Sequence, residues 1–156
     1  MKIGGVLVDG PNEAVLVLPH RGANLVLRAQ AIPDMTEFHL MCPKPIPPKI
    51  LTKDGPKEDT DNEHYVSQMI NFAQKRTAYL VVKSLECSDI EWDTVDPLNP
   101  STWARWDEDF RNAGLNEIQI QRIIDLVMEA NSLDDEKIKW ARDQVFAVGQ
   151  QEPKPE

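Results

Sequence analysis

Four prolines within the six residues 43–48 limit, more than any other feature, what this chain can fold into. Proline has no backbone amide donor and a fixed φ, so this segment excludes helix and central strand and favours an extended polyproline conformation. A polar stretch with four acidic residues continues to residue 62 and is predicted to be a loop. The predicted organisation is a β-rich module with a short helix at 1–42, a Pro-rich and acidic linker at 43–61, a helical domain at 62–149 and a flexible tail at 150–156.

The chain before the prolines has the pattern of an antiparallel ribbon. Short β-branched runs at residues 6–8, 14–18 and 24–32 alternate with turn residues. In the third run Leu25, Leu27 and Ala29 alternate with Val26, Arg28 and Gln30, which predicts one buried and one wetter face. Residues 34–41 are expected to form a short helix whose Met35, Phe38 and Met41 cover that sheet.

The chain after the prolines has helical periodicity. Apolar residues recur at helical spacing from Glu63 to about Leu85, and residues 90–95 are predicted to be a short strand or an extended connection. Asn99-Pro100 is typical of a helix start, and Asn116 with Gln119 of a capping box. A last helix should begin after Asp134. These features predict an α+β chain: a small antiparallel sheet, then three to five helices. The expected stripes of the first and last helices are Val66, Ile70, Ala73, Thr77, Leu80 and Ser84, and Ile138, Ala141, Val145 and Val148.

Charge is spread unevenly along the chain. The net charge is −9, with +2 on residues 1–57 and −11 on residues 58–156. An acidic surface repels phosphate and anionic lipid, so nucleic acid and membrane surfaces are expected to be poor partners. The expected partner is a protein with a basic or mixed surface.

No segment has the composition of a signal peptide or a membrane span, so we expect a cytoplasmic protein, in the host cytoplasm if a phage encodes it. Cys42 and Cys87 are the only cysteines. Two cysteines do not make a disulfide framework, and free thiols in a reducing compartment are expected.

We expect no metal-binding, cofactor-binding or catalytic site in this chain. His39 and Cys42 have a ligand-like spacing that His64 and Cys87 would complete, but a closed zinc site usually brings two such pairs. A calcium loop starting at Asp59 lacks its turn glycine and its final glutamate. There is no phosphate-binding glycine loop and no nucleophile elbow. The sequence therefore predicts no metal, no cofactor and no enzymatic activity.

One acidic cluster leaves a hydrolase as an alternative hypothesis. Glu91, Asp93 and Asp96 flank Trp92, which resembles a carboxylate pair for acid and base catalysis. Clustered acids beside an aromatic residue are more typical of a polar loop.

Candidate contact residues for a protein partner come from two regions. Tryptophan is enriched at binding hot spots, and Trp103, Trp106 and Phe110 share one helical face, with Trp140 further along. The alternative is that these rings are packing residues. Pro45 and Pro48 have the spacing of a polyproline ligand, for which the alternative is a stiff connector.

Several stretches follow one another in an order that we associate with one family. They are Leu25-Val26-Leu27-Arg28-Ala29-Gln30, Glu37-Phe38-His39-Leu40-Met41-Cys42-Pro43-Lys44-Pro45, Gln74-Lys75-Arg76-Thr77-Ala78-Tyr79-Leu80 with Ser84-Leu85, Thr102-Trp103, Ala113-Gly114-Leu115 and Val127-Met128-Glu129-Ala130-Asn131. In this order, over residues 13–148, the chain resembles the tail assembly chaperones of long-tailed bacteriophages and prophages. The resemblance is one of pattern, without a sharp motif.

This resemblance implies a non-enzymatic protein that covers the aggregation-prone tape-measure protein during tail assembly. It also implies that a longer product can arise by ribosomal frameshifting. Homo-oligomers, formed by edge pairing of the N-terminal ribbon, would allow several copies to line one client. The alternatives are a structural virion component, such as a neck or tail-completion protein, and a generic protein-interaction module.

Overall fold

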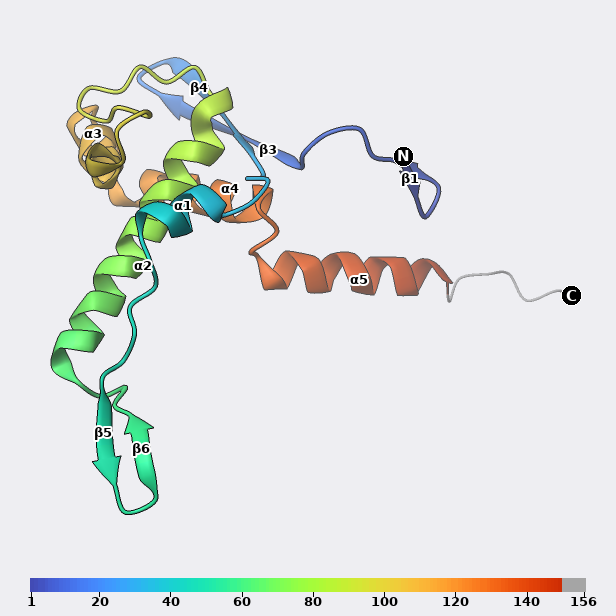
Figure 1. The fold of residues 1–156 in the computed structure, drawn as a ribbon. Coiled ribbons are helices and arrows are strands. Elements are labelled where there is room, and N and C mark those ends of the chain that lie inside the picture. The colour runs from blue at the N-terminus through green and yellow to red at the C-terminus, as the bar shows by residue number, and fades with distance from the viewer. Residues whose placement is uncertain (150–156) are drawn as a thin grey trace, which may run out of the picture.

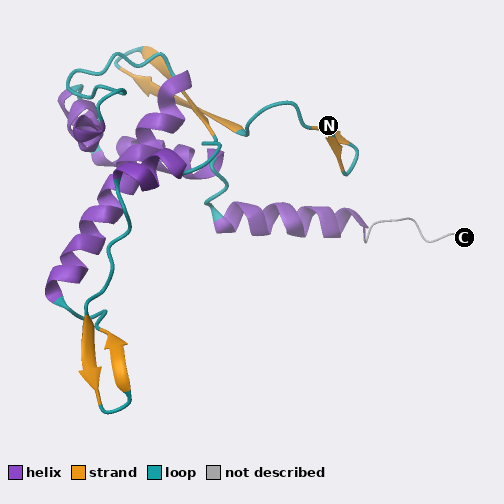
Figure 2. Cartoon of the chain, in the orientation of Figure 1, coloured by secondary structure: helices purple, strands orange, loops and turns teal. Residues whose placement is uncertain are grey.

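The computed structural model describes residues 1–149 and has the α+β architecture that the sequence predicts: small antiparallel sheets followed by a mainly helical part (Figure 1). Three separate two-stranded hairpins are visible in Figure 2. The strands are β1 (Lys2–Ile3), β2 (Val6–Leu7), β3 (Glu13–His20), β4 (Ala23–Gln30), β5 (Lys49–Thr52) and β6 (Gly55–Glu58). The helices are α1 (Thr36–Met41), α2 (Glu63–Ser84), η1 (Leu85–Cys87), η2 (Pro100–Arg105), α3 (Trp106–Asn112), α4 (Glu117–Ala130) and α5 (Asp135–Gly149).

The hairpin β3–β4 supplies the sheet side of the core. Its two-residue turn holds Arg21 at φ 49° and Gly22 at φ 80°, the left-handed pair that matches the twist of a tight hairpin. Along β4, Leu27 and Ala29 are buried and Leu25 is half-buried, whereas Val26 and Arg28 are exposed. The predicted alternation is therefore confirmed. The expected run at 90–95 forms an extended connection without a strand.

The core lies between this hairpin, the C-terminal half of α2, α3 and α4. Asn131, just after α4, joins three elements. Its Oδ1 accepts a hydrogen bond from Ile32 N at 2.8 Å, and its Nδ2 donates to Ser84 Oγ at 2.8 Å and to Val127 O at 2.8 Å. The core contains residues from both sides of the proline segment. The predicted division into a β-rich module at 1–42, a linker at 43–61 and a helical domain at 62–149 stays a prediction.

Helix boundaries around α3 and α4 follow the predicted capping chemistry. Asn99 Oδ1 accepts from Ser101 N at the start of η2, and Gly114 ends α3 with φ 97°. Asn116 and Gln119 form a reciprocal capping box, with two bonds of 2.9 Å. These local signals position the aromatic face of η2 and α3.

The short helix α1 packs differently from the prediction. Phe38 is buried, with its ring centroid 5.4 Å from Phe72 and 5.5 Å from Tyr79 of α2. Met41 is exposed. Phe38 therefore packs on aromatic residues of α2, where the sequence predicted that the helix covers the sheet.

A stalk projects from the core, which we define as the proline segment 43–48, the hairpin β5–β6 and the first turns of α2 (Figure 1). The sequence prediction of a polar loop was wrong here, since residues 49–58 form a hairpin. Gly55 adopts φ 103° at its turn, and Thr52 Oγ1 donates to Gly55 O at 2.6 Å.

Two further elements leave the core. The hairpin β1–β2 and helix α5 both extend away from it in Figure 1. Every residue from Met1 to Asn12 is exposed, and so is every described side chain of α5, from Asp135 to Ala147. The predicted tail at 150–156 and the side chain of Val148 lie outside the described residues.

The predicted helix stripes are only partly buried. On α2, Leu80 and Ser84 are in the core, whereas Val66, Ile70 and Ala73 lie on the stalk and are exposed. The stripe of α5, Ile138, Ala141 and Val145, is also exposed. No helix within residues 1–149 combines the length and apolar character needed to cross a bilayer.

Candidate protein-binding surfaces

The aromatic face of η2 and α3 is part of the core. Trp103 is only 4% exposed, and Trp106 and Phe110 are nearly as buried. Trp103 Nε1 donates to Pro97 O at 3.2 Å, and its ring lies 5.2 Å from that of Tyr79. Neighbouring aromatic rings cover most of these three side chains, which favours the alternative that they are packing residues, and their role as contact anchors stays a prediction.

Trp140 occupies the opposite kind of environment. It lies in the middle of α5 and is 65% exposed. An indole ring is a large apolar surface that is costly to leave in water. Of the four predicted aromatic anchors, Trp140 is by far the most exposed.

The two predicted prolines lie on the stalk. Pro45 is half-buried and Pro48 is exposed. Pro48 O accepts a hydrogen bond from Asp59 N at 2.7 Å, which closes the base of the hairpin β5–β6. Pro48 thus has a structural role, and Ile46, two residues before it, is 82% exposed.

Apolar side chains on the stalk have no cover. Leu51, at the hairpin, is 90% exposed, and Ile70 of α2 is 57% exposed. Val66 lies one turn before Ile70 on the same face. The stalk therefore continues the apolar stripe of α2 beyond the core.

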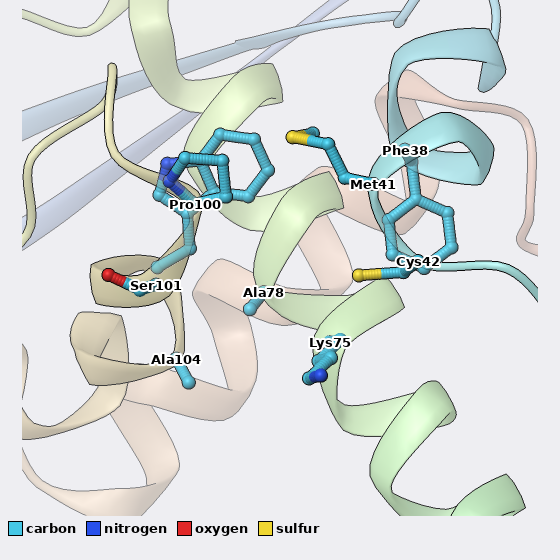
Figure 3. A pocket seen from close by; sticks show the side chains of 9 residues that line it. Phe38, Met41, Cys42, Lys75, Ala78, Pro100, Ser101 and Ala104 are labelled. Atoms are coloured by element: carbon cyan, nitrogen blue, oxygen red, sulfur yellow. The ribbon is translucent and has the colours of Figure 1, made fainter.

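A groove opens where α1, α2 and η2 meet (Figure 3). It has a volume of about 340 Å³ and a mostly apolar lining of Phe38, Met41, Cys42, Lys75, Ala78, Pro100, Ser101, Trp103 and Ala104. Lys75 is the one charged side chain among these residues. Within residues 1–149 it forms no ion pair with any carboxylate. The groove fits an apolar side chain with an acidic neighbour.

The groove was not predicted from the sequence. Its residues come from segments more than 20 positions apart, and only Trp103 among them was a candidate contact residue for a protein partner. The sequence did show that Phe38 and Trp103 are aromatic and so provide apolar surface. It did not show which part of that surface remains accessible in a groove after folding.

Metal-ligating side chains do not gather in the described part of the chain. No group of three or more histidine, cysteine or acidic residues is placed to hold an ion there. Cys42 lines the groove, whereas Cys87 Sγ lies 3.2 Å from Arg28 O, beside β4. Burial raises the pKa of the Cys87 thiol, and the nearby Glu13 adds to that shift.

The acidic segment around Trp92 is held in place by a residue that the sequence did not single out. Asp109 of α3 is buried and accepts hydrogen bonds from Thr94 N at 2.9 Å, Thr94 Oγ1 at 2.5 Å and Val95 N at 3.2 Å. Burial raises the pKa of the Asp109 carboxyl, but the hydrogen bonds from Thr94, Val95 and Asp93 outweigh it and leave the pKa below its usual value. Asp109 thus serves as an anchor for the loop.

The candidate carboxylates themselves lie on the surface. Glu91, Asp93 and Asp96 are exposed, and the Trp92 ring packs 5.2 Å from Phe110. Asp96 Oδ1 accepts from Leu98 N in a local turn. Exposed carboxylates on a local turn are typical of a solvated loop.

The clearest candidate surfaces are therefore apolar. They are the stalk and helix α5, which project from the core, and the groove at the base of the stalk. Compared with known proteins, the chain matches no protein-family model, no curated protein and no solved structure.

Proposed function

We propose that this chain is a non-enzymatic protein-binding protein whose projecting elements cover apolar surface on another polypeptide. One observation carries this proposal. Large apolar side chains on β1–β2, the stalk and α5 are exposed, and no residue in 1–149 packs over them. Exposed apolar clusters of this kind typically mark interaction surfaces.

The shape of these elements suits a long partner. The stalk and α5 leave the core in different directions in Figure 1, so one copy can contact a client at separated points. Amphipathic helices bind by laying an apolar face against a complementary one, and Ile70 and Val145 lie on such faces. The net charge of −9 keeps the resulting complexes apart in solution.

The specific role we propose is that of a tail assembly chaperone that covers the tape-measure protein of a long-tailed phage. The pattern over residues 13–148 supports this identity of the client, and the exposed apolar elements support the mode of action. Self-association through the hairpin β3–β4 is a further proposal. The edges of that hairpin are partly protected, since Ser88 Oγ bonds Arg28 N at 2.6 Å and Pro19 lies in β3.

Co-expression with the tape-measure protein tests the role. The soluble fraction of the client should rise with the wild-type chain and fall back with I70S, which removes a stalk side chain. I118S is the matched control, because Ile118 is just as exposed but lies on α4 of the core. Equal client solubility with and without the wild-type chain refutes the proposal, and equal loss with I70S and I118S refutes the stalk as the binding element.

A structural component of the virion, such as a neck or tail-completion protein, is the second candidate. The same projecting elements favour it, because arms that bury their apolar residues only against neighbours are suited to a permanent assembly. Mass spectrometry of purified particles separates the two roles. A chaperone is absent from finished particles, whereas a structural component is present in a fixed number of copies.

A further inference from the structure

Helix α5 has no stabilising neighbour within residues 1–149. It spans 15 residues, and an isolated helix of this length is marginal in water. Its start is held to α4 by an ion pair of 2.7 Å between Lys137 Nζ and Glu129 Oε2. Both side chains of this pair are substantially exposed, so it contributes little stability. We therefore expect α5 to be completed by another surface.

The two sides of α5 differ in chemistry. Ile138, Ala141 and Val145 lie on one side at helical spacing. Trp140 lies on the opposite side, with Glu136 one turn before it and Asp143 one turn after it on the same side. That side therefore carries one large ring with a carboxylate on either side of it along the helix, beside Lys137, whose charge is paired with Glu129.

The groove between α1, α2 and η2 has the complementary chemistry. Its lining is apolar, its volume of about 340 Å³ accommodates one large side chain, and its only charged lining residue is the cation Lys75. In Figure 3 the Lys75 side chain lies beside Ala78 and below Cys42, at the edge of the group of lining side chains. An indole ring with an adjacent carboxylate matches the groove in size and in charge.

We propose that Trp140 of one copy docks in this groove of a second copy, with Glu136 or Asp143 of α5 facing Lys75. Within one chain α5 leaves the core on the side away from α3 and η2, as Figure 1 shows, and the Lys137–Glu129 pair directs its start. A second copy is therefore the occupant that the arrangement favours. This inference concerns self-association alone and does not depend on the identity of any client.

The geometry of this contact sets the kind of assembly. Tryptophan and groove lie on different surfaces of the same chain, so each copy offers one of each. Such a head-to-tail contact is heterologous: it closes into a ring or continues as an open array. A row of copies with repeated apolar stalks is the form that would line an extended client.

Two variants used together test the contact on the purified full-length chain. W140A removes the ring and keeps the groove, whereas A104E keeps the ring and places a carboxylate in the exposed part of the groove lining, next to the incoming acidic residues. Sedimentation velocity should show concentration-dependent association of the wild type. Each variant alone should associate at least about 30-fold more weakly, the effect of removing a binding hot spot.

The mixture of the two variants is the decisive sample. An intact groove on W140A and an intact ring on A104E allow one contact only, so the mixture should give a 1:1 complex with twice the 17.7 kDa mass of one chain. I118S is the matched control and should associate like the wild type, because Ile118 on α4 is about as exposed as Trp140 but lies outside both the groove and α5. If A104E melts at a lower temperature than the wild type, S101E replaces it at another exposed lining position.

Three results overturn the inference. They are a wild-type chain that stays monomeric at all concentrations, a mixture that stays monomeric while the wild type associates, and W140A that associates like the wild type. If W140A associates normally but no longer keeps the tape-measure protein soluble, Trp140 contacts the client and not a second copy. Because the sedimentation samples contain no client, their failure leaves the co-expression test of the proposed function unaffected.

Discussion

Replacing Asp109 with asparagine tests whether one buried carboxylate holds the acidic loop to α3. The two oxygens of Asp109 accept three hydrogen bonds, from Thr94 N, Thr94 Oγ1 and Val95 N. Asparagine has one oxygen in place of two and an amide group that points hydrogen atoms at hydrogen-bond donors. D109N keeps the volume of the side chain, so its effect reports on the hydrogen bonds and the charge.

The expected cost follows from these three bonds. A hydrogen bond to a charged group contributes about 1.5–3 kcal/mol, and a buried donor left without a partner costs about 1–3 kcal/mol. Asparagine loses at least one such bond and weakens the others, and part of the loss is recovered by relaxation of the loop. We expect D109N to lower the free energy of unfolding by about 2–4 kcal/mol at pH 7. For a chain of this size that corresponds to a fall in Tm of about 5–15 °C.

The pH dependence gives the prediction a second signature. The pKa of the Asp109 carboxyl is lower in the folded chain than in the unfolded chain, where it is about 3.9. The stabilisation is therefore fully present above about pH 3.9 and is lost as the pH falls through the folded-state pKa. The difference in stability between wild type and D109N should shrink over the same range, because asparagine does not titrate.

Urea unfolding followed by tryptophan fluorescence measures both quantities, between pH 7 and the lowest pH at which the wild type is folded. D107N is the matched control, since Asp107 lies on the same helix in an exposed pair with Arg111. Its cost should stay below about 0.5 kcal/mol. An effect of D109N as small as that of D107N at pH 7, or a difference that does not shrink at low pH, would refute the reasoning.

Other changes follow from the local structure. G114A should lower the free energy of unfolding by about 1–2 kcal/mol, because φ 97° is strained for any residue with a Cβ; thermal melts measure it. N116A, which removes the side-chain half of the capping box, should cost about 1 kcal/mol by urea unfolding. I123A should lower the free energy of unfolding by about 2–5 kcal/mol, because Ile123 is fully buried. I70A, on the exposed stalk, should change the same free energy by less than about 0.5 kcal/mol. Equal losses for the two variants would show that the stalk is packed in solution.

Local signals made much of the fold predictable. Turn residues and alternating β-branched runs indicated β3 and β4, and asparagine caps with a following glutamine or proline indicated the starts of η2 and α4. Such signals act over three or four residues, so one sequence is enough to detect them. The dipeptide Asp54-Gly55 was a signal of the same kind for the hairpin β5–β6, but the neighbouring prolines concealed the short strands.

Burial was less predictable than secondary structure. Periodicity shows that one side of a helix is apolar, but it does not show whether another element covers that side. The stripe on α2 illustrates this, since Leu80 is in the core and Ile70 is open to solvent on the same helix. For the same reason Trp103 and Trp140 were equal candidates from the sequence, and only the fold separates the packed ring from the exposed one.

Helix α2 runs without interruption from Glu63 on the stalk to Ser84 in the core. Unpartnered turns at its beginning should exchange their amide hydrogens quickly, while the turns near Val82 remain protected for much longer. Helix formation is cooperative, so a partner that immobilises the first turns also slows exchange further along the same helix. A polypeptide bound to the stalk would thereby add rigidity to the interior, and the melting temperature of the whole chain would rise with the fraction of chains that hold such a partner.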